Sequence, residues 1–115
     1  MTRIKRIYDL PSPEDGRRML VDRLWPRGVA REKARVDEWL KEMAPSDGLR
    51  KWFAHDPAKW EEFRQRYLEE LQGQKEVLER LRAEAKRGTV SLLYAARDIE
   101  HNNAVVLREL LENPD

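Results

Sequence analysis

Residues 89–94 read TVSLLY and are the clearest strand signal in the chain. The run is β-branched and apolar, and it stands between Gly88 and a polar segment, a pattern typical of a buried strand. A block of helical segments precedes it, and one more helical segment follows it. This order of strands, helices, strand and helix predicts an α/β sandwich with residues 89–94 at the centre of its sheet.

Two shorter strands are expected before the helices. Residues 4–8 (IKRIY) and 19–22 (MLVD) each carry a short apolar run, and residues 10–16 (LPSPEDG) between them are rich in turn-forming types. By its length alone, this connection favours an antiparallel pair, since a parallel crossover usually needs about a dozen residues or more. Residues 31–33 are expected to form a single turn, and residues 36–40 stay open between strand and helix.

Capping residues indicate where the first two main helices begin. Ser46 is expected to cap a short helix that reaches Phe53, and Asp56 to cap a longer helix that ends at Gly73. Helical spacing places four side chains on one face of the longer helix, which we expect to pack on the sheet: Trp60, Phe63, Tyr67 and Leu71.

Two more helices complete the expected fold. Residues 75–87 alternate in charge and predict an amphipathic helix with a solvated face, ending at Gly88. Asp98 is expected to cap the last helix, from about residue 99 to residue 111. Residues 113–115 are expected to form a frayed tail.

The composition limits the classes of function. A chain of 115 residues suits one domain, here residues 1–115, and the absence of cysteine excludes thiol catalysis and cysteine-ligated zinc. Although 39% of the residues are charged, the net charge is only +1, so nucleic acid is the least expected partner. No apolar stretch reaches the length of about 20 residues that a membrane helix needs, so we expect a cytoplasmic protein that binds no membrane.

Polar residues follow the apolar run of residues 19–21 directly, in the segment 22–28 (DRLWPRG). Ligands of open α/β sheets bind outside the carboxyl ends of the strands, so this segment marks a candidate site. Arg23 and Arg27 form a candidate clamp for an anion, Trp25 a stacking wall, and Gly28 a close backbone approach. The alternative is a structural turn in which Asp22 pairs with an arginine and Trp25 joins the core.

Residues 44–55 (APSDGLRKWFAH) hold a second group of candidates. A helix that begins at Ser46 would offer backbone N–H groups to an anion, with Arg50 and His55 nearby. The alternative is an ordinary capped helix, in which His55 is stabilised by the helix dipole and has no chemical role.

Residues 94–103 (YAARDIEHNN) hold the third group, again directly after a strand. If the strands run parallel, this segment lies beside residues 22–28, and Asp98, His101 and Asn102 would orient or protonate a ligand. Alternatively, Asp98 is only a helix cap. The candidate catalytic residues are His101, Asp98, His55 and Asp22. The candidate ligand-binding residues are Asp22, Arg23, Trp25, Arg27, Gly28, Ser46, Arg50, Tyr94 and Asn102. No motif predicts a metal site or a cofactor.

Four blocks of the chain resemble the YeaO-like family, in the superfamily known as domain of unknown function 488: DGRRMLVDRLWPRG, WLKEMAPSDGLRKWFAHDP, FRQRYLEEL and VSLLYAARDIEHNNAVVL. The resemblance implies a compact single α/β domain with a largely parallel, Rossmann-like sheet flanked by helices. It also implies that the first two strands are parallel, with residues 10–16 as a shortened connection. It implies no established activity. Many members of the wider superfamily carry a cysteine where Tyr94 stands here, so thiol chemistry does not transfer.

The leading expectation is therefore a protein that binds a small anion, either a phosphorylated metabolite or a nucleotide, in an arginine-rich pocket at the strand carboxyl edge. A second hypothesis is an enzyme of hydrolase or group-transfer type that uses His and Asp for acid–base chemistry. The third is a nucleic-acid-binding module. The sequence leaves the oligomeric state open.

Overall fold

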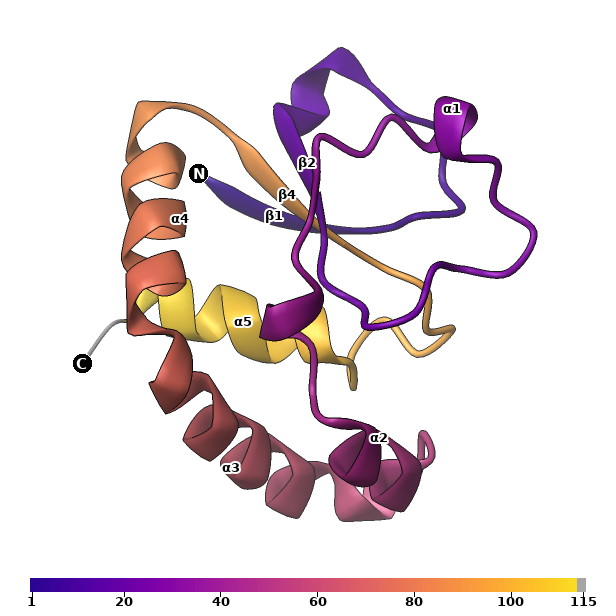
Figure 1. The fold of residues 1–115 in the computed structure, drawn as a ribbon, viewed down its shortest axis with the longest axis vertical. Coiled ribbons are helices and arrows are strands. Elements are labelled where there is room, and N and C mark those ends of the chain that lie inside the picture. Colours follow the sequence, from indigo (N-terminus) through magenta and orange to yellow (C-terminus); the bar gives the residue numbers. More distant parts are fainter. Residues whose placement is uncertain (114–115) are drawn as a thin grey trace.

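The strand at Val90–Tyr94 (β4) lies inside a four-stranded sheet in the computed structural model, which describes residues 1–113 (Figure 1). Its neighbours are β1 (Thr2–Arg6) and β2 (Arg17–Leu20), and a two-residue strand, β3 (Glu38–Trp39), extends the sheet beyond β2. The three strand pairs are parallel. The expected single α/β domain with a parallel sheet and a central β4 is therefore confirmed.

The position of β4 explains how a short connection can join parallel strands. Ser91 of β4 is in register with Arg3 of β1 on one side and with Arg18 of β2 on the other, so β4 separates β1 from β2. The antiparallel arrangement expected from loop length is wrong, because that rule applies to strands that lie next to each other. The parallel arrangement implied by the family resemblance is correct.

A buried carboxylate holds this connection together. Asp15 ends a 3₁₀ turn, Pro13–Asp15, and is fully buried. Its carboxylate lies 3.0 Å from Lys5 Nζ on β1 and 2.5 Å from Arg18 Nη1 on β2. The next residue, Gly16, has φ 62°, and a Cβ there would lie 2.1 Å from the carbonyl oxygen of Thr89. The connection therefore depends on an ion-pair network and on one glycine.

Residues 36–40, for which the sequence did not distinguish strand from helix, contain the edge strand β3. A single turn, α1 (Arg31–Ala34), precedes the edge strand β3, and a 3₁₀ turn, Lys41–Met43, follows it. The backbone N–H of Leu40 donates to the carbonyl oxygen of Leu20 at 2.8 Å, which continues the pairing with β2.

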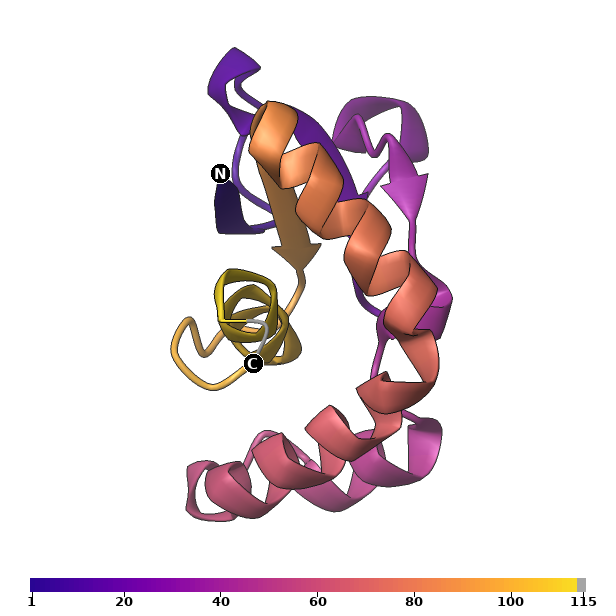
Figure 2. The ribbon, with the colours of Figure 1, turned by 90° about the vertical axis from the view of Figure 1, so that its left-hand side faces the viewer.

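The remaining helices are α2 (Asp47–Phe53), α3 (Trp60–Leu71), α4 (Lys75–Arg87) and α5 (Asn103–Glu112). Helix α5 contacts β1 and β4, and α4 contacts β4 and α5. Figure 2 shows α5 between the sheet and α3. Helix α3 makes its main contacts with α2 and α5. Phe63 and Tyr67 are nevertheless buried in the same core as the inner face of the sheet.

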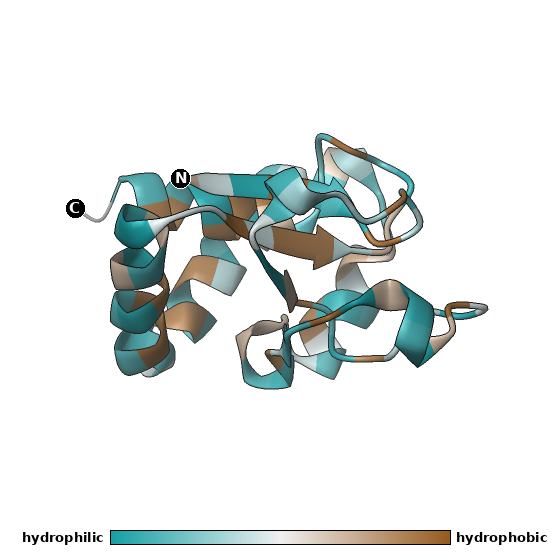
Figure 3. Cartoon of the chain, turned by 90° about the horizontal axis from the view of Figure 1, so that it is seen from above, coloured by the Kyte–Doolittle hydropathy of each residue, from teal (hydrophilic) through white to brown (hydrophobic). Residues whose placement is uncertain are grey.

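Both faces of β4 are covered. Val90, Leu92 and Tyr94 belong to the main core with the helices, whereas Leu93 packs in a smaller cluster under residues 25–39. This explains the uninterrupted apolar run, because a strand covered on both faces does not alternate with polar residues. Figure 3 shows the hydrophobic residues gathered on the strands and on the helix faces turned toward them. Within residues 1–113, no helix is long and apolar enough to cross a membrane.

The last helix begins later than expected. Asn102 caps α5, since its Oδ1 accepts the backbone N–H of Val105 at 3.1 Å. Asp98 instead accepts the backbone N–H groups of Glu100 and His101 in a preceding turn. The expectation that Asp98 caps a helix from residue 99 is therefore wrong. Residues 114 and 115 of the expected frayed tail lie outside the described part of the chain.

Candidate functional site

The segments that follow β2 and β4 lie side by side, as their parallel strands predict. Val21 N–H donates to the carbonyl oxygen of Leu93 at 3.1 Å. One residue further, the carboxylate of Asp22 accepts the backbone N–H of Ala95 at 2.9 Å. Both segments therefore reach the same edge of the sheet, where ligands of parallel α/β folds bind.

A cavity of about 740 Å³ opens at this edge. Three parts of the chain meet around it, and they are the same three that the sequence marked as candidates. The lining comes from residues 22–27, 95–98 and 101–103, and from Ala44, Pro45, Arg50, Phe53, His55 and Phe63. Apolar and aromatic side chains form much of this wall, and charged groups stand among them.

Arg23 is held by the segment before α2, and Arg50 lies within α2 itself. Arg23 donates from Nε to the carbonyl oxygen of Pro45 at 3.2 Å and from Nη2 to that of Ala44 at 3.4 Å. Asp47 lies 4.0 Å from Arg23 Nε and 3.5 Å from Arg50 Nη2. The carboxylate of Asp47 thus holds the two guanidinium groups on one side of the cavity.

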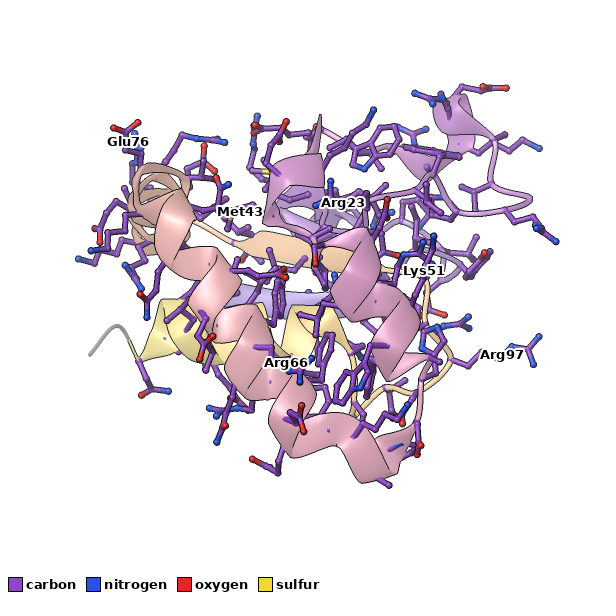
Figure 4. The ribbon with its side chains drawn as sticks, turned by 60° about the horizontal axis from the view of Figure 1, so that its bottom comes forward. Arg23, Met43, Lys51, Arg66, Glu76 and Arg97 are labelled. Carbon is purple, nitrogen blue, oxygen red and sulfur yellow. The ribbon has the colours of Figure 1, made fainter. Side chains whose placement is uncertain are left out.

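Two more arginines stand at the rim. Arg27 and Arg97 are both exposed, and neither guanidinium has a hydrogen-bonding or ionic partner within residues 1–113. Figure 4 shows Arg97 projecting away from the ribbon, whereas Arg23 lies within the body of the molecule. The sequence prediction did not include Arg97 among the ligand-binding residues. Arg97 nevertheless follows β4 in the same polar segment, 94–103, as the candidates Asp98 and His101.

Asp22 is half-buried where β2, β4 and α5 meet. Besides the N–H of Ala95, it accepts a hydrogen bond from Asn103 Nδ2 at 3.2 Å, and Nδ2 also donates to the carbonyl oxygen of Val21. Burial raises the pKa of the Asp22 carboxyl, and the two hydrogen bonds and the nearby His55 offset only part of this rise. The expected pairing of Asp22 with an arginine is wrong, because its partners are a backbone amide and an asparagine. The sequence prediction did not include Asn103, because its contact with Asp22 depends on the placement of α5 beside β2.

His101 and Asp98 form a close pair in the cavity wall. His101 Nδ1 lies 2.9 Å from Asp98 Oδ2, and the imidazole ring meets the edge of Trp60 at a centroid distance of 5.2 Å. The hydrogen bond from the Glu100 backbone, followed by the one from His101, lowers the pKa of Asp98 below its ordinary value. The expected residues are thus present as a histidine oriented by a carboxylate.

His55 reaches the cavity from a strained piece of backbone. It follows α2, where Ala54 has φ 47° and His55 itself has φ 58°. Left-handed conformations are unfavourable for residues with a Cβ, so the structure holds His55 in place at a cost.

Three predicted ligand-binding residues do not line the cavity. Ser46 caps α2, and Glu70 already occupies this helix terminus by bonding the Ser46 backbone N–H at 2.8 Å and Oγ at 2.6 Å. Tyr94 is buried in the core, and Gly28 lies in an exposed turn with φ 78°. These three candidates therefore lie outside the cavity lining.

Trp25 lies in the cavity wall and also packs against the smaller core cluster. It lines the cavity, and its ring also packs edge-on against Trp39 and under the guanidinium of Arg31. Its indole N–H donates to the carbonyl oxygen of Val29 at 2.8 Å. Within residues 1–113, no group of three or more histidine, aspartate or glutamate side chains lies close enough to hold a metal ion.

The relatives that this chain matches are described as uncharacterised proteins. The protein YeaO of Escherichia coli is 42% identical over 109 residues, which cover 95% of both chains. Uncharacterised proteins of Mycobacterium tuberculosis and Mycobacterium bovis are 41% identical over 109 residues, 95% of this chain and 92% of theirs. No solved structure matches the chain. The family model described as the inactive DUF488-N3 subclade matches residues 1–114. The chain therefore belongs to the YeaO-like DUF488 family.

Proposed function

We propose that the protein binds a small phosphate-bearing molecule in the cavity at the carboxyl edge of the sheet. The observation that carries this proposal is the gathering of guanidinium groups on one concave surface. Arg23, Arg27, Arg50 and Arg97 line it together with the carboxylates of Asp22 and Asp98. A third carboxylate, that of Asp47, lies beside Arg23 and Arg50. The cationic groups therefore outnumber the anionic ones.

The carboxylates in the wall are also engaged with other groups. Asp98 is bonded to His101, and Asp22 accepts hydrogen bonds from Ala95 and Asn103. The guanidinium group binds phosphate oxygens through two parallel N–H donors, which makes arginine the preferred residue for this recognition. The positive end of the α5 dipole adds to the field, since Asn102 and Asn103 at its start are part of the lining.

Two facts favour binding over catalysis. The chain has no cysteine at the strand end where many members of the wider superfamily carry one, and Tyr94 stands there instead. The family model that matches the chain is described as inactive. A cavity with largely apolar walls and a few placed charged groups is the usual form of a small-molecule binding site.

The proposal is tested by thermal unfolding in the presence of inorganic phosphate and of adenosine monophosphate (AMP). A ligand that binds only the folded state raises the unfolding temperature, because it stabilises by about 2.7 kcal/mol at 100 times its Kd. We expect both compounds to raise the Tm, and Arg27→Ala to reduce this rise. Arg87→Ala is the matched control, since Arg87 is exposed at the end of α4, away from the cavity.

An equal rise in both variants, or no rise in the wild type, would overturn the proposal.

The pair of His101 and Asp98 favours a second candidate, an enzyme of hydrolase or group-transfer type. A carboxylate that orients an imidazole is the usual arrangement of a general base. If the protein is such an enzyme, it releases phosphate from a phosphate ester. The substitution His101→Asn then abolishes this release and leaves the Tm unchanged. Phosphate release that is the same in both proteins would remove this candidate.

A further inference from the structure

We infer that the ligand is a nucleoside phosphate, and that Asp22 accepts hydrogen bonds from its ribose hydroxyl groups while the arginines hold its phosphate. This inference rests on the proposed function and adds the class of ligand and the residue that selects it. Three features of the cavity carry it: the unfilled acceptor sites of Asp22, the separation of charges, and the aromatic walls.

Asp22 has hydrogen-bonding capacity left for a ligand. A carboxylate offers about four acceptor sites on its two oxygens. Within residues 1–113, Oδ2 receives the N–H of Ala95 and Oδ1 receives Asn103 Nδ2, one donor to each oxygen. The side chain is half-buried and part of the cavity lining, so we assign the remaining sites to a bound molecule.

The negative charge of Asp22 determines which groups of a ligand can bind at its free acceptor sites. A phosphate group placed against this carboxylate is repelled, because two like charges at short distance disfavour each other. The phosphate therefore has to lie toward the arginines, and a different part of the ligand must face Asp22. That part needs a neutral or positive hydrogen-bond donor, and a hydroxyl group supplies one next to a phosphate ester.

Asp22 and the exposed arginines lie at different depths in the cavity. Asp22 lies at the edge of the sheet, bonded to the backbone directly after β4. Arg27, Arg50 and Arg97 line the same cavity and are exposed. A ligand with its hydroxyl groups inward and its phosphate outward matches this order. Acidic residues at strand ends of dinucleotide-binding folds hold ribose hydroxyls in the same way.

The walls favour a ligand that also carries a flat ring. Trp25 and the exposed Leu24 line the cavity, and the buried Phe53 and Phe63 contribute only small parts of their surface, so Trp25 is the main aromatic wall. The volume of about 740 Å³ lies within the range of about 300–1,000 Å³ that binds drug-sized molecules. A simple sugar phosphate or an amino acid leaves this apolar surface without a partner, whereas a nucleobase covers it.

The test is a calorimetric titration of the full chain with three compounds: AMP, AMP lacking both ribose hydroxyls, and inorganic phosphate. Hydrogen bonds to a charged acceptor predict that AMP binds roughly 10- to 100-fold more tightly than the compound without hydroxyls. Asp22→Asn is expected to remove most of this difference. Asp9→Asn, a change of the same kind at an exposed carboxylate outside the cavity lining, is expected to preserve it.

Equal affinity of the wild type for AMP with and without the hydroxyls would overturn the inference, whether or not Asp22→Asn folds. Binding of phosphate with no preference for AMP would also overturn it, and the proposed function would stand. Failure of all three compounds to bind would overturn both. A preference for AMP that persists in Asp22→Asn would show that another residue selects the hydroxyls.

Discussion

The carboxylate of Asp22 and the backbone N–H of Ala95 are joined by a hydrogen bond of 2.9 Å across 73 residues of sequence. This bond links the ends of β2 and β4 one residue beyond their last backbone pairing. It fixes an acidic group at the carboxyl edge of the sheet, and Asn103 at the start of α5 supports it from the other side. The position of the acid in the cavity is therefore set by the sheet and by α5.

The pH dependence of stability should report the burial of Asp22. Burial raises the pKa of this carboxyl above its ordinary value of 3.8, so the folded protein holds the proton to higher pH than the unfolded chain. The contribution of Asp22 to stability is thus full below pH 3.8 and is lost as the pH rises through the raised pKa. Urea denaturation should show wild type losing free energy of unfolding relative to Asp22→Asn over this window. A difference in the free energy of unfolding between wild type and Asp22→Asn that stays constant with pH would contradict the raised pKa of Asp22.

The contribution of Asp15 to stability should have the opposite pH dependence to that of Asp22. Burial alone would raise its pKa, but hydrogen bonds from the Ser12 backbone, Lys5 and Arg18 outweigh burial and lower it below 3.8. Asp15→Asn leaves Arg18 buried without its ionic partner, so we expect a loss of about 3 kcal/mol or more at pH 7.

The matched control for Asp15→Asn is Glu14→Gln, at the exposed neighbouring position, which should change stability by less than about 0.5 kcal/mol. The stabilising effect of the Asp15 charge is present above its ordinary pKa and is lost as the pH falls through the lowered one. The gap between wild type and Asp15→Asn should therefore narrow below pH 3.8. A gap that widens in acid would show that the carboxyl is not held ionised.

Phe63 should be a main source of stability for the helical layer. It is 2% exposed and stacks on Phe53 at a centroid distance of 4.2 Å, and Tyr67 and Trp60 lie at 5.7 Å. Phe63→Ala should cost about 3–5 kcal/mol in chemical denaturation. Gln65→Ala, at an exposed position of the same helix, should have little effect. A cost for Phe63→Ala below about 1 kcal/mol would mean that this cluster is loosely packed.

The end of α2 offers a substitution that should stabilise the protein. Ala54 adopts φ 47°, which costs a residue with a Cβ about 1–2 kcal/mol, so Ala54→Gly should raise the free energy of unfolding by about 1 kcal/mol. The same change at Ala83, an exposed position inside α4, should lower it by about 1 kcal/mol. Thermal or urea unfolding of the two variants checks the sign. Destabilisation of both would indicate that Ala54 is not strained.

The sequence predicted the sheet well because its central strands are covered on both faces. Leu92 faces the helices and Leu93 faces residues 25–39, so β4 shows the uninterrupted apolar run of a buried parallel strand. The location of the cavity followed from the same pattern, since parallel strands bring the residues after them to one edge. The sequence did not show how the first two strands connect, because the length of a loop does not reveal that β4 lies between them.

Interactions between distant residues explain most of the errors. Ser46 has the chemistry of a helix cap that could also hold an anion, but Glu70, 24 residues away, occupies that position. Asp98 and Asn102 are both good capping residues, and local chemistry does not decide which of them starts the helix. Asn103 was missed because its contact with Asp22 depends on how α5 is placed against β2.

The most direct test of the central claim is an NMR titration of isotope-labelled protein with inorganic phosphate, following backbone amide and arginine Nε–H signals. We predict saturable shifts in residues 22–27 and 95–103 and in the Nε–H of Arg23, the guanidinium held inside the cavity by Ala44 and Pro45. The backbone amide signals of α4, none of whose residues lines the cavity, should not shift. Shifts confined to exposed basic residues of α4, or no saturable shift in these segments, would contradict the binding of an anion in this cavity.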